Sequence, residues 1–176
     1  MQLKEQKKAL QAFGKYVVQQ ARTILTKNKG NDKKGFTTNN TKQLYDSLSY
    51  QIDDVSVGSR LYFEMEDYGQ YQDRGVSGTE RKYNTPFSYK STSKLIGLEY
   101  NTGYLGKWAA ANKLQPRLKN GRYGTYKQMG FILAQSIKKK GLKPSLFFTK
   151  PFERGLKRLP EELANGLSTD FDNFLS

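Results

Sequence analysis

The sequence predicts an α+β fold in which a small antiparallel β-sheet packs against a long N-terminal helix and C-terminal helices, with a long irregular insertion between them. Three patterns indicate this class. Apolar residues recur at helical spacing over 3–27, they alternate with polar residues over 48–52 and 61–65, and helical spacing returns over 122–140 and 161–175. For a chain of 176 residues we expect a single domain spanning 1–176.

The N-terminal segment 1–27 is expected to be one amphipathic helix. Its apolar stripe consists of Leu3, Leu10, Phe13, Tyr16 or Val17, Ile24 and Leu25. Gly14 in its middle costs about 1 kcal/mol relative to Ala and marks a point of close packing. The next segment, 28–40, is a polar loop with almost nothing to bury, and we expect it to be mobile unless a partner orders it.

The sheet and a corner that follows it are expected within 41–75. A helical turn over 41–47 has Thr41 as its N-cap, and the first strand follows it. Because Val55 and Val57 have the opposite parity to that strand, a bulge or tight turn is expected at Asp53–Asp54.

The chain is organised around Leu61–Gly78. A two-residue hairpin signal, Gly58–Ser59, precedes it and leads into a strand over 61–65. The spacing then becomes helical over 67–74, and one helical face carries Tyr68, Tyr71 and Gln72. We expect Gly75 and Gly78 to stop this short helix and to allow positive φ.

The segment 76–121 is expected to be an irregular insertion. Gly, Ser, Thr, Asn and aromatic residues dominate it, and Pro86 and Pro116 interrupt any continuous element. A short helix over 104–114, around Trp108, is the exception. A loop of this length inside a compact domain is usually functional or ordered by a partner.

The C-terminal helices are expected within 122–176. The first helix runs to Lys140, with Gly141 as its C-cap, and its buried face carries Tyr126, Met129, Ile132 or Leu133, and Ile137. A turn is expected at Pro151, and Pro160 occupies the first position of the last helix. The stripe of that last helix consists of Leu163, Leu167, Phe171, Phe174 and Leu175.

The composition argues against an enzyme. The chain has no His and no Cys, so it lacks the usual general base, the commonest zinc ligand and any thiol nucleophile. It also has no Walker loop, dinucleotide fingerprint or nucleophile elbow. We therefore expect no catalytic residue, no cofactor and no metal. No apolar run approaches the roughly 20 residues that span a bilayer, so we expect no membrane partner.

Two small patterns leave alternatives open. Glu64 and Glu66 share one strand face and could hold a hard cation, although a solvated face or an interface with a basic neighbour is the favoured interpretation. The segment Gly121–Gly124 could cradle a phosphate, although a plain turn is favoured.

The net charge of +14 is unevenly placed, because residues 101–150 contain 11 basic and no acidic side chains. Such a stretch repels itself unless an anionic partner, nucleic acid or an acidic protein surface, faces it. Basic side chains interleaved with tyrosines can grip single strands by stacking and by backbone contact. In the simpler interpretation, the apolar residues of 122–140 form the buried face of a helix and most of the lysines form its solvent-exposed face.

Three features in order resemble a known family. A leading helix over 3–27 precedes Leu44-x-x-Ser47-Leu48, then comes the tyrosine-rich corner Tyr68–Gly75, and Lys143–Phe152 leads into the last helix. This arrangement resembles the tail-completion or neck proteins of tailed bacteriophages, in which an L-x-x-S-[IL] segment, a Y-A-x-x-x-E-x-G corner and a P-x-P-F segment follow the helix.

The resemblance covers about half of the chain, and two departures matter. The family's small residue and acid are here Gly69 and Asp73, and the segment between Gly75 and Lys143 is far longer than compact members need. The resemblance implies an α+β fold without enzyme activity. It also implies a structural virion subunit of the neck, such as a tail terminator or head–tail connector, assembled in the host cytoplasm.

The resemblance implies a homo-oligomeric ring that joins portal or connector proteins to the tail tube. An acidic corner and a basic region are natural opposites across neighbouring subunits, and we expect the interface to include Glu64, Glu66, Asp67, Tyr68, Tyr71, Asp73, Arg122, Lys127, Lys138, Lys139 and Lys140. Other cations are candidates to face DNA in the channel: Lys107, Lys113, Arg117 and Lys119. The alternative function is non-specific nucleic-acid binding by 101–150.

Overall fold

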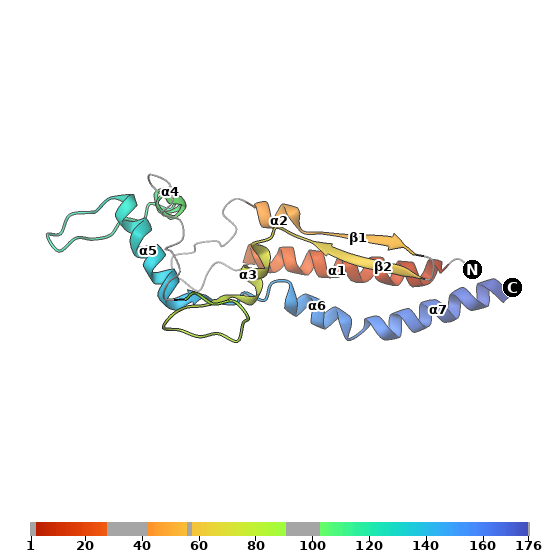
Figure 1. Ribbon diagram of the computed structural model, residues 1–176. Helices are drawn as coiled ribbons and strands as arrows, with labels where there is room; N and C mark the ends of the chain where they lie inside the picture. Colours follow the sequence, from red (N-terminus) through yellow and green to blue (C-terminus); the bar gives the residue numbers. More distant parts are fainter. Residues whose placement is uncertain (1–2, 28–41, 56–57, 91–102, 176) are drawn as a thin grey trace. The chain divides into compact units, whose positions relative to one another are not determined.

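The computed structural model describes residues 3–27, 42–55, 58–90 and 103–175 (Figure 1). It confirms the expected α+β class: a two-stranded antiparallel sheet packs against long N- and C-terminal helices. The loop expected over 28–40 lies outside the described residues.

The chain divides into two compact units. Unit 1 comprises Met1–Gly69 and Leu146–Ser176, and unit 2 comprises Gln70–Ser145. The inserted segment forms its own unit because its two ends pair: Val76–Ser77 forms an antiparallel ladder with Gly141–Leu142 and closes the segment on itself.

Unit 1 is built on one long helix. Its elements are α1 (Lys4–Lys27), α2 (Gln43–Ser47), β1 (Ser49–Asp54), β2 (Ser59–Glu64), α6 (Thr149–Leu156) and α7 (Leu159–Leu175). The hairpin of β1 and β2 and the pair α6 and α7 all pack on α1, and the start of α1 lies close to the end of α7 (Figure 1). Gly14 allows the close packing expected of it, because a Cβ there would lie 2.6 Å from the Tyr50 ring.

The hairpin in unit 1 corrects the predicted strand boundary. The ladder runs without interruption from Ser49↔Glu64 to Asp54↔Ser59, so the bulge expected at Asp53–Asp54 is absent from it. The chain turns after Val55, whose N–H donates to the Gly58 carbonyl at 3.1 Å. The hairpin signal at Gly58–Ser59 therefore predicted the hairpin but placed its turn too late.

The helix boundaries of unit 1 also differ from the prediction. Lys42, with φ of 55°, is the N-cap of α2, and Thr41, which was expected in that role, lies outside the described residues. Pro151 makes no turn, because it lies in the first turn of α6, where the amide that it lacks has no intrahelical partner. The last helix begins at Leu159, so Pro160 is its second residue.

Unit 2 contains β3 (Val76–Ser77), α4 (Gly103–Ala111), α5 (Tyr126–Lys140) and β4 (Gly141–Leu142), while α3 (Gly69–Arg74) begins at the last residue of the first part of unit 1. The segment 76–121 is thus less irregular than expected. Gly75 ends α3 with a φ of 74°, as predicted, whereas Gly78 is not among the positive-φ residues. A Cβ on Gly78 would instead collide with the backbone of Lys139.

The helix α5 begins at Tyr126 instead of Arg122. Thr125 and Gln128 form a capping box: the Thr125 hydroxyl accepts from the Gln128 N–H at 3.2 Å, and the Gln128 side chain accepts from the Thr125 N–H at 2.8 Å. Of the two alternatives for its inner face, Leu133 is half-buried and Ile132 is 46% exposed. Gly141 ends the helix as expected.

Candidate functional site

The three segments that carry the family resemblance meet in the core of unit 1. One hydrophobic cluster joins Leu44 and Leu48 of the Leu44-x-x-Ser47-Leu48 segment to Phe147 of the Lys143–Phe152 segment, and all three side chains are at most 2% exposed. In the corner segment, a Cβ added to Gly69 would lie 2.9 Å from Leu44. These segments, far apart in the sequence, therefore form one packed unit with the inner face of α1.

Ser47 fixes the corner to this cluster. Its hydroxyl oxygen accepts a hydrogen bond from the Glu66 backbone N–H at 3.1 Å, and the hydroxyl donates to the Leu44 carbonyl at 3.2 Å. In the pattern Leu44-x-x-Ser47-Leu48 the leucines are buried, and the serine binds the backbone of Glu66, two residues after the end of β2. The resemblance thus rests on residues with a structural role.

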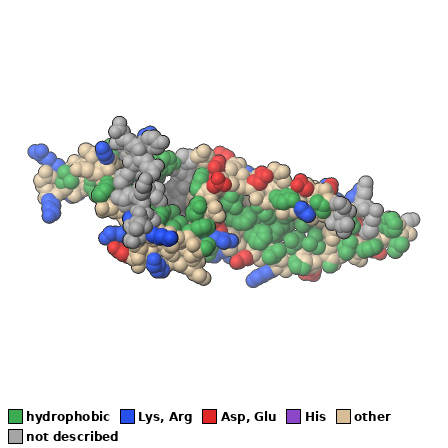
Figure 2. Space-filling model, in the orientation of Figure 1, with side chains coloured by type: hydrophobic (Ala, Val, Ile, Leu, Met, Phe, Trp, Pro, Cys, Tyr) green, Lys and Arg blue, Asp and Glu red, His purple; other side chains and the backbone are tan. Residues whose placement is uncertain are grey.

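An aromatic cluster lies beside this core, between β2 and α6. Phe63 meets Phe148 and Phe152 at ring-centroid distances of 5.3 and 5.9 Å, both edge to face, and Phe13 lies 5.7 Å from Phe152. Phe13 is buried, whereas the other rings are only half-buried. Figure 2 shows hydrophobic side chains gathered over this part of unit 1, between the hairpin and the C-terminal helices.

The end of α7 carries a second apolar surface. The stripe of α7 continues past the part of the helix that is covered, and Phe171, Phe174 and Leu175 are 49%, 65% and 80% exposed. The expected stripe is correct as a pattern, but only Leu163 and Leu167 of its members are half-buried within unit 1.

Asp170 lies beside this surface and caps the start of α1. Its carboxylate accepts from the backbone N–H groups of Glu5, at 3.0 and 3.1 Å, and of Gln6, at 3.1 Å. Burial raises the pKa of Asp170, but these hydrogen bonds, that of the Lys4 N–H and the positive charge of Lys8 together outweigh it and hold the pKa below its ordinary value. No sequence pattern predicts this cap, because the partners of Asp170 lie at the opposite end of the chain.

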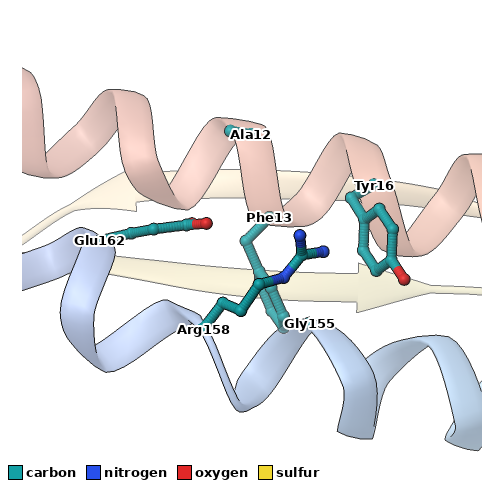
Figure 3. A pocket seen from close by; sticks show the side chains of 6 residues that line it. All are labelled: Ala12, Phe13, Tyr16, Gly155, Arg158 and Glu162. Carbon is teal, nitrogen blue, oxygen red and sulfur yellow. The ribbon is translucent and has the colours of Figure 1, made fainter.

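A shallow groove of about 190 Å³ lies between α1 and the α6–α7 connection (Figure 3). Ala12, Phe13 and Gly155 supply nonpolar surface, and the Arg158 guanidinium reaches across to lie 5.3 Å from the centre of the Tyr16 ring. The remaining polar group is Glu162.

The acidic residues predicted for the subunit interface have different environments. Glu64 is exposed and accepts from Gln51 Nε2 at 3.0 and 3.1 Å across the hairpin, and Asp67 is exposed, whereas Glu66 is half-buried. Asp73 is only 4% exposed, so its burial removes it from the candidate surface. In the described part of the chain, no group of three or more Asp and Glu side chains is placed to hold a metal ion.

The tyrosines of the corner remain candidates for contact. Tyr68 is 41% exposed and Tyr71 is 40% exposed, and the Tyr71 ring lies 4.6 Å from that of Phe87. Both rings therefore offer surface while part of each is held in place.

The basic residues predicted for the interface also separate into two groups. Lys138, Lys139 and Lys140 form the last turn of α5, where the carbonyls of Lys138 and Lys139 accept from the N–H groups of Thr79 and Glu80. The Lys139 ammonium also lies 3.1 Å from the Glu80 carboxylate. This turn contributes to the fold of unit 2, where cations stabilise the helix C-terminus.

Arg122 and Lys127 are both exposed, but Lys127 lies on α5, whereas Arg122 lies in the β-hairpin 115–124 that precedes α5. Arg117 and Lys119, predicted to face DNA, lie in the same hairpin and are exposed. The other two members of that set, Lys107 on α4 and Lys113 just beyond it, are exposed as well.

The charge of the chain is concentrated in unit 2. Unit 2 contains 15 basic and 3 acidic residues, a net charge of +12, whereas unit 1 contains 15 and 13, a net charge of +2. The sequence predicted an uneven charge distribution, and the fold assigns almost all of the excess to one unit.

Comparisons with known proteins returned no match: no family model, no curated protein and no solved structure is similar to this chain. Within the described residues, no helix has the length and apolar character needed to cross a membrane.

Proposed function

We propose that this chain is a structural virion protein of a tailed bacteriophage, a ring-forming neck or tail-completion subunit that joins the head and portal to the tail. The convergence of the three resemblance segments on one core, with Leu44, Leu48, Gly69 and Phe147 in or against it, carries this proposal. Segments that match a family only by chance have no reason to meet in space.

The surface of unit 1 supports assembly. A ring needs two different patches that meet head to tail and close by rotation. The exposed end of α7 can supply one of these patches, because Phe171, Phe174 and Leu175 are 49%, 65% and 80% exposed. Exposed apolar patches of this kind mark protein–protein contact sites. In the proposed ring, copies of this chain cover one another there, in the virion neck after assembly in the host cytoplasm.

Mass photometry and negative-stain electron microscopy of the purified protein test this proposal. We expect closed rings of uniform size. Replacing Phe171, Phe174 and Leu175 with Gln should shift the population to monomers, because the contact loses most of its apolar area. The matched control replaces three exposed apolar residues of unit 2 with Gln, namely Tyr104, Phe131 and Ile132.

The control variant should retain the rings. Even a weak interface, with a dissociation constant of about 100 µM, would give detectable assembly at about that protein concentration. A folded wild-type protein that stays monomeric there would contradict the proposal. Equal loss of rings in both variants would mean that the end of α7 is not the contact.

Unit 2 favours a second function. This function is non-specific nucleic-acid binding, and the net charge of +12 supports it because such a charge favours an anionic partner.

A further inference from the structure

Residues 115–124 of unit 2 form a narrow β-hairpin. Arg117 and Tyr123 form an antiparallel bridge, and the Leu118 N–H donates to the Arg122 carbonyl at 2.9 Å. At the tip, the Gly121 N–H donates to the Leu118 carbonyl at 2.9 Å, and Gly121 has a φ of 81°. A type I turn followed by a left-handed glycine is a common three-residue hairpin connection.

The base of the hairpin is also held. The Gly124 N–H donates to the Pro116 carbonyl at 2.8 Å, and the Gln115 side-chain amide donates to the Gly124 carbonyl at 3.1 Å. The capping box of α5 begins at the next residue, Thr125. The hairpin is therefore an ordered projection anchored to a helix.

Cations surround this hairpin. Residues paired across an antiparallel ladder point to the same face, so Arg117 and Tyr123 share one face and Arg122 lies on the other. Lys119 lies at the tip. All four side chains are exposed, Tyr123 to 70%, and no acidic residue occurs anywhere in 101–150.

We propose that this hairpin binds the phosphate backbone of double-stranded DNA without sequence preference. A two-stranded ribbon, with strands about 4.8 Å apart, fits the roughly 12 Å wide major groove, where phosphates flank it on both sides. Cations on both faces and at the tip match that arrangement. An acidic protein surface would approach from one side and would leave part of the charge unused, so we favour nucleic acid.

The salt dependence of binding provides the first measurement. Three phosphate contacts give a slope of log affinity against log salt of about −2.7, or about a 40-fold loss between 50 and 200 mM. Contacts by Lys107, Lys113 or Lys127 would steepen the slope. Anisotropy titrations use two fluorescently labelled DNA duplexes of unrelated sequence, each about 24 base pairs or roughly two helical turns long. Both duplexes should bind equally.

Substitution of the cations provides the decisive comparison. R117Q/K119Q/R122Q should weaken binding by about tenfold or more at 50 mM salt and should reduce the magnitude of the slope by about 2.7. The control K15Q/R154Q/K157Q removes the same charge from exposed positions of unit 1 and should leave the slope unchanged. Circular dichroism of both variants verifies that they fold.

Three results would overturn this inference: no binding at 50 mM salt, equal weakening by both triple variants, or a clear preference for one sequence. Tight binding of an acidic protein with no binding of duplex would assign the hairpin to a protein partner instead. The inference does not depend on the ring, because mass photometry of R117Q/K119Q/R122Q reads assembly separately. Rings without duplex binding would remove this inference alone, and duplex binding by a monomer would remove the proposed function alone.

Discussion

Unit 1 and unit 2 are stabilised in different ways. The buried hydrophobic residues of unit 1 include large side chains such as Phe13, Leu25 and Phe147, whereas those described in unit 2 are Val76, Ala109 and Ala134. Unit 2 also carries a net charge of +12 against +2 in unit 1. A small core and strong self-repulsion reduce stability.

This difference indicates a division of roles. Unit 1 has the core that maintains its fold, and Leu44, Leu48, Gly69 and Phe147 of the segments that resemble the family lie in or against this core. Unit 2 is held by backbone hydrogen bonds between 76–81 and the end of α5 and by the close crossing of α4 and α5. A partner of opposite charge would stabilise unit 2 by binding its folded state.

The largest expected effect tests the core of unit 1. Phe147→Ala removes a side chain that is 0% exposed and should lower the free energy of unfolding by about 3–5 kcal/mol, through lost burial and the cavity that remains. The control Phe131→Ala in unit 2 removes a ring that is 44% exposed and should cost less than about 1 kcal/mol. Urea unfolding followed by circular dichroism measures both.

Equal costs for the two phenylalanine variants would contradict the contrast between the units. A small cost for Phe147→Ala alone would mean that the cluster with Leu44 and Leu48 is not the core on which the fold of unit 1 depends.

The second effect tests the helix crossing in unit 2. A Cβ on Gly130 would lie 2.7 Å from the Gly106 backbone nitrogen and 3.0 Å from its Cα. Ala is about 1 kcal/mol better than Gly within a helix, but backbone atoms cannot move aside as a flexible side chain can. Gly130→Ala should therefore destabilise unit 2 by about 1–3 kcal/mol.

Hydrogen exchange provides the measurement, because it reads the amides of each unit separately. Amides of α4 and α5 should exchange faster in Gly130→Ala, and those of α1 should not change. The exposed control Gln135→Ala on the same helix should leave both sets unchanged. Slower exchange in α5 of Gly130→Ala would show that propensity outweighs the close crossing.

The sequence predicted the packing of unit 1 better than that of unit 2, and the reason is again the size of the side chains in each core. Periodic apolar stripes predicted α1, β2 and α7, because large side chains that must be buried leave a regular pattern. In unit 2 the contact between α4 and α5 depends on Gly106, Gly130 and Ala134, which carry little hydrophobic signal. The pairing of β3 with β4 involves only two residues on each side, so no alternation could reveal it.

The candidate surfaces were predicted in part. The charge of 101–150 indicated Arg117 and Lys119, and the Asn120–Gly121 pair is a hairpin signal, but the flanking strands are too short to show alternation. Asp73 looked like a surface acid because acidic residues are usually exposed, and only its burial in the fold corrects this.

The smallest effect concerns the contact between the two ends of unit 1. The folded-state pKa of Asp170 lies below its ordinary value, because the N–H groups at the start of α1 and the positive charge of Lys8 together outweigh the effect of burial. A lowered folded pKa stabilises the protein above the unfolded pKa of about 3.9, and this stabilisation disappears as the pH falls through the folded pKa. Asp170→Asn removes the charge, so it should lower the melting temperature at pH 6 by less than either variant above.

The pH dependence distinguishes this cap from a general loss of packing. The difference in melting temperature between wild type and Asp170→Asn should be largest at pH 6 and should shrink below about pH 4. Asp172→Asn, an exposed residue on the same helix, provides the control and should melt like the wild type at each pH. A difference for Asp170→Asn that stays constant down to pH 2 would mean that the carboxylate charge does not stabilise the start of α1. The antiparallel packing of α1 and α7 would then depend on apolar contacts alone, as the rest of the core of unit 1 does.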